Sequence, residues 1–254
     1  MKPIITFAAL ITTTIIIYSQ NEINRTLSLD LGYSFHQYKM TSLNENLIDN
    51  YINDLERLED RITIGRSLYA GIGFSLNRYF ENRFNFCYDR GISENTATIN
   101  TIIDGQVVEV PGQFIARSRA LSLSFSTQFY LNQLNLLKPK SENIFIHGFQ
   151  YGPEFNIGYG FGNFIMHSAI PSENIYGEFL FKANGMKYQF GFRSEYTFGL
   201  NSSLVSLGFA FGYQLFKTSD LKRYSGDNLI GFGESTPNLD FSGWYYGVYL
   251  KFGK

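Results

Sequence analysis

An alternating stretch in the second half of the chain, Tyr188 to Phe198 (YQFGFRSEYTF), narrows the choice of fold more than any other segment. Aromatic side chains occupy every even position except Ser194, while Gln, Gly, Arg, Glu and Thr occupy the odd positions. Because successive side chains of a β-strand point to opposite faces, the segment predicts a strand with one aromatic face and one polar or small face. The aromatic face must then pack on a protein core or face lipid.

The same alternation recurs along the rest of the chain. Most of the repeats are about as long as a transmembrane strand, which needs roughly 9–11 residues and shows this period of two as its sequence signature. With the first stretch they make eight predicted strands. The seven further segments are Arg25–His36, Ser67–Asn77, Arg83–Asp89, Ala120–Tyr130, Phe149–Phe161, Val205–Leu215 and Trp244–Phe252.

The connections between these segments alternate between short and long. The short ones are Arg78–Asn82, the somewhat longer Asn132–Asn143, and Asn201–Ser203. The long ones are Lys39–Arg66, Gly91–Ser118, Gly162–Lys187 and Lys217–Phe241. Short turns on one side and long loops on the other are typical of outer-membrane barrels, whose long loops lie outside the cell. An even number of strands then places both termini on the periplasmic side.

Composition separates a membrane barrel from a soluble lipocalin-like barrel or β-sandwich. Charged residues make up only 17% of the chain and aromatic residues another 17%, with 24 glycines. The non-aromatic face of the strands carries mainly Gly, Ser, Asn and Gln, which suit the narrow interior of an eight-stranded barrel. We therefore predict an all-β, transmembrane, antiparallel up-and-down barrel with its aromatic face toward lipid.

Charge and cysteine content exclude other classes. The formal net charge is −1, which gives no support to nucleic-acid binding, and the single cysteine, Cys87, excludes an intrachain disulfide framework. Glycines alternate within strands and do not precede a helix, so no phosphate-binding loop is predicted. We expect no cofactor.

The N-terminus has the pattern of a targeting segment. Lys2 precedes an apolar run, Ile4–Ile17, that is short for a membrane-spanning helix but fits a secretory signal peptide. We assign residues 1–19 to the signal peptide and residues 20–254 to an outer-membrane β-barrel. An uncleaved anchor helix is the alternative.

Charged residues fall on the inward face of several predicted strands. Charges of both signs in a lumen of low dielectric constant must pair, because an isolated buried charge is very costly. We expect a structural salt-bridge network, with an ion pathway as the alternative. The members are Asp30, Asp89, Glu154, Lys187, Arg193, Glu195 and Lys251.

Two of the long connections contain their own structural signals. Asn46–Ile62 has apolar residues at helical spacing, which predicts an amphipathic helix that is either a lid over the barrel mouth or a docking site for a partner. Asp104-Gly105 and Asn184-Gly185 are strong hairpin signals, and counting both hairpins would give ten strands instead of eight. The apolar positions of the helix are Leu47, Ile48, Tyr51, Ile52, Leu55 and Leu58.

Histidines offer only a weak signal for catalysis. Ser34 and His36 share one strand face, and Asp89 or Glu154 could supply an acid, as in outer-membrane lipases and acyltransferases. A Ser and a His two residues apart in a strand are common by chance, so we expect no catalytic residues. The histidines are also too scattered for a metal site.

The last strand carries Gly247, Leu250 and Phe252 at the spacing of the C-terminal signal that the barrel assembly machinery reads. A final barrel strand without any recognition role would look similar.

These features together resemble a known group. The signal ending in YSQ, the strands GYGFG and LGFAFGYQLF, and the terminal GVYLKF are similar to Bacteroidota outer-membrane β-barrel proteins of the PorT-like or OmpA/OmpX type. The resemblance implies a non-enzymatic barrel of the outer membrane that serves as an accessory, scaffold or surface-binding component of an envelope assembly. Some members of the group belong to secretion-related assemblies. Its expected partners are outer-membrane lipids, the assembly machinery during insertion and an envelope protein. A narrow porin-like channel and a lipid-modifying enzyme are the alternatives.

Overall fold

The computed structural model describes most of the region assigned to the barrel. The described residues are 27–48, 61–75, 77, 79–103, 106–131, 134, 149–170, 175–200, 203–229 and 236–253. The predicted signal peptide, residues 1–19, lies outside them.

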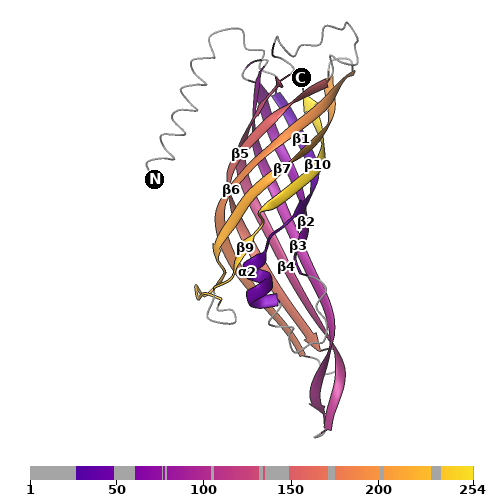
Figure 1. Cartoon of the computed structure of the whole chain (residues 1–254), viewed down its shortest axis with the longest axis vertical. Helices are drawn as coiled ribbons and strands as arrows, with labels where there is room; N and C mark the ends of the chain where they lie inside the picture. Colours follow the sequence, from indigo (N-terminus) through magenta and orange to yellow (C-terminus); the bar gives the residue numbers. More distant parts are fainter. Residues whose placement is uncertain are drawn as a thin grey trace.

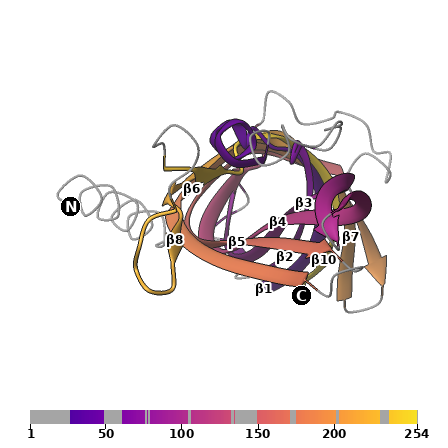
Figure 2. The ribbon, with the colours of Figure 1, turned by 90° about the horizontal axis from the view of Figure 1, so that it is seen from below.

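Eight long antiparallel strands close into a ring (Figures 1 and 2). Each strand pairs with the next along the chain, and β10 closes the ring by pairing with both β7 and β1. Two short strands, β8 (Lys222–Arg223) and β9 (Asn238–Asp240), pair alongside β6 and β7 at one end of the barrel and are not part of the ring. The eight-stranded barrel is therefore confirmed. The ring strands are β1 (Leu27–Gln37), β2 (Ile64–Ser75), β3 (Phe80–Ile103), β4 (Gln106–Phe129), β5 (Phe149–Ile170), β6 (Ile175–Leu200), β7 (Ser203–Asp220) and β10 (Gly243–Gly253).

Two predicted long loops are instead extensions of strands. The predicted loop Gly91–Ser118 is the far part of β3 and β4, which pair out to Ile103 and Gln106 on either side of Asp104-Gly105, as that hairpin signal predicted. The predicted loop Gly162–Lys187 is likewise the far part of β5 and β6. With 22 to 26 residues each, β3 to β6 therefore reach well past β1, β2 and β10 at this end, which we call the loop end. The opposite end, where β1 begins and β10 ends, is the terminal end.

The hairpin predicted at Asn184-Gly185 is wrong. Both residues lie inside β6, where they pair with Phe161 and Gly160 of β5. Gly185 is needed there for packing, because a Cβ atom at this position would lie only 2.3 Å from the Lys217 carbonyl oxygen. A glycine that allows close backbone approach looks the same in sequence as a glycine that allows a turn.

The outer surface of the ring is apolar, as predicted for a membrane barrel. In β6, Phe190 is 67% exposed, whereas Arg193 and Glu195 are buried on the inward face. Leu123 of β4 and Trp244 of β10 are likewise more than 60% exposed. A continuous apolar surface of this kind is stable only against lipid or another apolar surface, and closure leaves no unpaired strand edge in the ring. Among the described residues, no helix is long and apolar enough to cross a membrane.

Buried apolar side chains close the loop end of the barrel. Inward-facing residues of β4 to β7 pack there against residues from the first and last long connections. We call this cluster the mouth plug. It contains Tyr38, Met40, Leu43, Ile48, Ile62, Phe114, Ala116, Ala120, Phe164, Met166, Phe181, Ala183, Phe216, Leu221, Leu239 and Phe241.

The predicted amphipathic helix contributes to this plug at its two ends. Helical structure begins earlier than predicted, as α2 (Thr41–Leu43) and a π-helical turn, η1 (Asn44–Ile48). Asn44 joins the two ends, since its side-chain amide donates to the Ile62 carbonyl at 3.2 Å and its oxygen accepts from the Ile62 amide at 3.1 Å. Ile48 and Ile62 are fully buried, which favours a lid over a docking site. Tyr51, Ile52, Leu55, Leu58 and the side chain of Leu47 lie outside the described residues.

Removal of a plug side chain should destabilise the barrel. Phe241 is fully buried, stacked on Phe216 with 5.4 Å between ring centroids and edge-on to Tyr38 at 5.2 Å. Phe241→Ala should lower the free energy of unfolding by about 3–5 kcal/mol, since it leaves a cavity. Urea unfolding in lipid vesicles, followed by the fluorescence of Trp244, measures this change. Tyr224→Ala, at an exposed position, is the control, and an equal loss in the two variants would contradict the plug.

Candidate functional site

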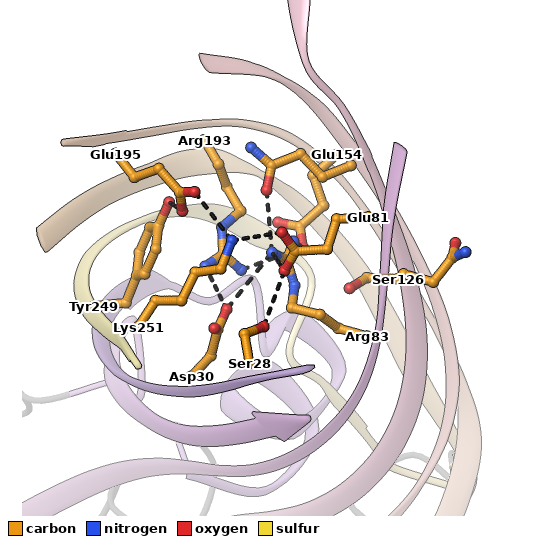
Figure 3. Close-up of polar contacts among 12 residues, drawn as sticks. Ser28, Asp30, Glu81, Arg83, Ser126, Glu154, Arg193, Glu195, Tyr249 and Lys251 are labelled. Carbon is orange, nitrogen blue, oxygen red and sulfur yellow. Dashed lines mark hydrogen bonds and ion pairs between the residues drawn. The ribbon is translucent and has the colours of Figure 1, made fainter. Parts of the chain in front are cut away.

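The lumen of the terminal end contains a cluster of buried charges (Figure 3). They come from β1, β3, β5, β6 and β10, and alternation along each strand turns them inward. We call this cluster the lumen network. Its charged members are Asp30, Glu81, Arg83, Glu154, Arg193, Glu195 and Lys251.

Arg83 lies at the centre of this network and is fully buried. Its guanidinium contacts Glu154 Oε1 at 2.5 Å, Glu81 Oε1 at 3.2 Å and Asp30 Oδ2 at 3.5 Å. It also donates to Gln128 Oε1 at 3.0 Å. One side chain from β3 therefore joins β1, β4 and β5 across the lumen.

Arg193 shares two of these acids. Its guanidinium contacts Asp30 Oδ2 at 2.8 Å and Glu154 Oε1 at 3.4 Å, so Arg83 and Arg193 are bridged on both sides by carboxylates. The Arg193 guanidinium also lies 3.7 Å from the centre of the Tyr249 ring, a cation–π arrangement. Bridging acids and the ring offset the repulsion between two neighbouring arginines.

Lys251 organises the other side of the network. Its Nζ lies 2.5 Å from Glu81 Oε2 and 3.0 Å from Glu195 Oε1. The Tyr130 hydroxyl donates to Glu81, and the Tyr249 hydroxyl donates to Glu195 Oε2 at 3.0 Å. Three cations thus face four carboxylates, which leaves one net negative charge in a site where hydroxyls and amides supply the remaining hydrogen bonds.

A second ion pair lies nearer the loop end. Lys187 Nζ donates to Asp89 Oδ2 at 3.1 Å and to Ser122 Oγ at 3.3 Å. The space between this pair and Arg193 is a cavity of about 40 Å³, also lined by Tyr69, Cys87 and Tyr245. A volume of this size holds only a few water molecules.

All seven charged residues predicted to face the lumen do so, in two groups. Asp30, Glu154, Arg193, Glu195 and Lys251 belong to the lumen network, while Lys187 and Asp89 form the separate pair.

Sequence reasoning missed Arg83, Glu81, Tyr130 and Tyr249. Alternation from Asp89 already places Arg83 inward, so this residue could have been found. Glu81 was assigned to a turn because the predicted strand began at Arg83, whereas β3 begins at Phe80.

The Ser34–His36 pair forms, but without an acid. Ser34 Oγ and His36 Nε2 are 2.8 Å apart, and the imidazole is buried and stacked on Tyr245. Nδ1 of His36 has no hydrogen-bond partner among the described residues, so neither Asp89 nor Glu154 completes a Ser-His-acid triad. Within the described ranges no three potential metal ligands cluster.

The three residues of the predicted assembly signal lie on β10. Leu250 and Phe252 face outward and are 43% and 40% exposed. Gly247 faces the lumen, where a Cβ atom would lie 2.4 Å from the Tyr33 carbonyl oxygen. Packing alone therefore requires this glycine, and a recognition role stays a prediction.

Closed strand pairing, an apolar outer surface and a charged lumen define the chain as an eight-stranded transmembrane β-barrel. No protein-family model and no curated protein sequence matches it.

Solved structures similar to the chain include bacterial outer membrane proteins. The attachment invasion locus protein Ail of Yersinia pestis, solved with the heparin analogue sucrose octasulfate, has 9% identity and a TM-score of 0.37, covering 90% of this chain and 96% of that one. A major outer membrane protein from Thermus thermophilus has 13% identity and a TM-score of 0.41, with coverages of 89% and 99%. The outer membrane protease OmpT of Escherichia coli has 8% identity and a TM-score of 0.34, with coverages of 93% and 97%. The fold assignment rests on the strand pairing of this chain itself.

Removing the positive charge of Arg83 should destabilise the barrel. Arg83→Gln leaves Glu154, Glu81 and Asp30 with less compensation in a buried site, so the free energy of unfolding should fall by about 3–5 kcal/mol. Urea unfolding in lipid vesicles measures this loss. The double variant with Glu154→Gln should lose less than the sum of the two single variants, by about 0.5–3 kcal/mol. Strict additivity would show that the two side chains do not interact.

Proposed function

We propose that this protein is a non-enzymatic, non-conducting barrel of the bacterial outer membrane that acts through its outer surfaces, as an accessory, scaffold or surface-binding component of an envelope assembly. The observation that carries the proposal is the filled lumen. A barrel whose interior is occupied by its own side chains has only its lipid-facing and loop surfaces left for contacts with other molecules. A secretion-related assembly is the more specific form of this proposal and rests on the sequence resemblance.

Two separate layers support the absence of conduction. At the terminal end, Arg83 and Arg193 contact acids from opposite parts of the ring, which places guanidinium groups across the lumen. At the loop end, the mouth plug replaces polar inward residues with buried aromatic and aliphatic ones. An ion would have to displace paired charges and then cross apolar packing, and each step is costly.

The buried position of His36 argues against lipid chemistry. A lipid substrate would reach a catalytic pair from the membrane, whereas His36 and Ser34 lie in the lumen beneath the plug. His36 also lacks an acid on Nδ1 among the described residues.

The hairpin of β3 and β4 is the element best placed for contact with a partner. The strands pair continuously from Arg90 to Ile103, a run of about 45 Å at roughly 3.4 Å per residue. Figure 1 shows this hairpin projecting past the rest of the barrel. Near its tip Val107 is 72% exposed, and Val108 beside it is also exposed. An exposed apolar tip on a long arm favours binding to another protein.

Shortening this hairpin tests the binding role. Ala97 and Gly112 are register partners of the same kind as Ile103 and Gln106, so replacing residues 98–111 by Asn-Gly joins them through a two-residue turn. We expect an envelope protein to copurify with the wild type in mild detergent and its yield to fall at least tenfold with the shortened variant. Replacing only Asp104-Gly105 by Asn-Gly is the control and should retain the partner. Purification of a lone barrel from native outer membranes would contradict the scaffold role.

Planar-bilayer recording tests the filled lumen. The wild type should give no discrete conductance steps, and Arg193→Gln or Glu195→Gln should not create a stable conducting state, because the mouth plug still blocks the path. Discrete steps in the wild type that change with either substitution would establish the channel alternative. Faster migration of unheated samples on SDS gels confirms that each preparation is a folded barrel.

A further inference from the structure

Three arginines lie side by side on the outer surface of the barrel. Arg66 of β2 pairs directly with Arg90 of β3, and Arg90 pairs directly with Arg119 of β4. Side chains directly opposite in adjacent strands have Cβ atoms about 4.5–5.5 Å apart, and like charges at such positions are destabilising. Arg117, the next outward residue of β4, extends the same patch. We call these four residues the arginine row.

The arginine row has no counter-ion within the part of the chain that the structure describes. No carboxylate there comes within ion-pair distance of the guanidinium groups of Arg66, Arg90 or Arg119. The Nε atoms of Arg117 and Arg119 are shielded from solvent and have no hydrogen-bond partner. Buried N–H donors without acceptors cost free energy, as does the repulsion between the side chains. An anionic ligand would offset both costs.

The row interrupts the apolar outer surface, since Ile64 and Ile92, the next outward residues of β2 and β3 toward the loop end, are also exposed. The next outward positions toward the terminal end, on the same three strands, are Leu68, Tyr88 and Leu121, which are again direct neighbours. All outward residues of these strands beyond them are uncharged down to the terminal end. The arginines therefore lie at one end of a long uncharged stretch of the outer surface, which is the position expected for contact with lipid headgroups.

A groove on the outer surface lies between the row and the terminal end. It has a volume of about 570 Å³ and is lined mainly by apolar side chains of β2, β3 and β4, including Ala70, Ile72, Phe86 and Leu123. Ala70 pairs with Phe86, and Phe86 pairs with Leu123, four residues along each strand from the arginines. That separation is about 13 Å along the strand. A cationic site and an apolar groove thus follow one another on the same strands.

We propose that the arginine row binds the phosphate of a phosphorylated membrane lipid of the leaflet at the loop end, with an acyl chain of that lipid in the groove below. Guanidinium groups bind phosphate oxygens through paired hydrogen bonds, and neighbouring arginines can share one phosphate. A soluble anion would use only the arginines, and an acidic protein surface would not use a groove within the lipid belt. Identification of this leaflet as the outer one, and hence of the lipid as a phosphorylated glycolipid, rests on the proposed function.

Native mass spectrometry of the full-length protein in detergent micelles tests this site. The probe is lipid A carrying phosphate, compared with its enzymatically dephosphorylated counterpart and with inorganic phosphate. The wild type should bind the phosphorylated lipid at least tenfold more tightly than the dephosphorylated one, and R66Q/R90Q/R119Q should lose this difference. The triple variant K182Q/K217Q/K222Q removes the same number of positive charges from exposed positions on β6, β7 and β8. This control should still bind the phosphorylated lipid more tightly than the dephosphorylated one.

Several outcomes would overturn the proposal. Equal losses in the two triple variants would mean a general effect of charge, and equal binding of inorganic phosphate would mean a site for soluble anions. Loss of a copurifying protein in the arginine variant, with lipid binding unchanged, would assign the row to a protein partner. SDS-gel mobility before and after heating shows that each variant is folded. Lipid binding is measured without any protein partner, so a failed copurification experiment would contradict the scaffold role and leave the lipid site unaffected.

Discussion

Closure of the backbone hydrogen-bond ladder is the constraint on which the rest of this structure depends. Lipid offers no partners to backbone N–H and C=O groups, so a sheet can cross a membrane only when its first and last strands pair. Here β1 pairs with β10 from Ser28–Gly253 to His36–Tyr245. This pairing turns an alternating sheet into a surface with an apolar outside and a closed inside.

The closed inside then dictates the chemistry of the lumen. Inward positions of a narrow barrel lose contact with water, so each charge placed there needs partners. The terminal end meets this requirement with arginines bridged by shared acids, and the loop end meets it with apolar side chains. The two solutions fill the barrel and move the functional surfaces to its outside. The arginine row is the reverse case, because its charges are adjacent and of the same sign, and the proposed lipid phosphate would compensate them.

Local signals were reliable where their physical cause was local. Alternation placed Arg193, Glu195 and Lys251 inward correctly, because side-chain direction in a strand depends only on position along that strand. The hairpin of β3 and β4 was also predicted correctly, since Ile103 pairs with Gln106. Asn184-Gly185 was misinterpreted, because the reason for Gly185 is the approach of the Lys217 backbone from β7, a contact distant in sequence. Glu81 was missed because strand ends are set by pairing with neighbours.

By itself, the sequence determined the strands, their inner and outer faces, and the membrane class of this protein. Only the tertiary structure decided which charges meet, since Arg193 and Asp30 are separated by 163 positions and come together through the stagger and closure of the ring. The same holds for the mouth plug and for the arginine row, whose members come from three strands. The physical reason is that alternation fixes the direction of a side chain, whereas register between strands fixes its neighbours.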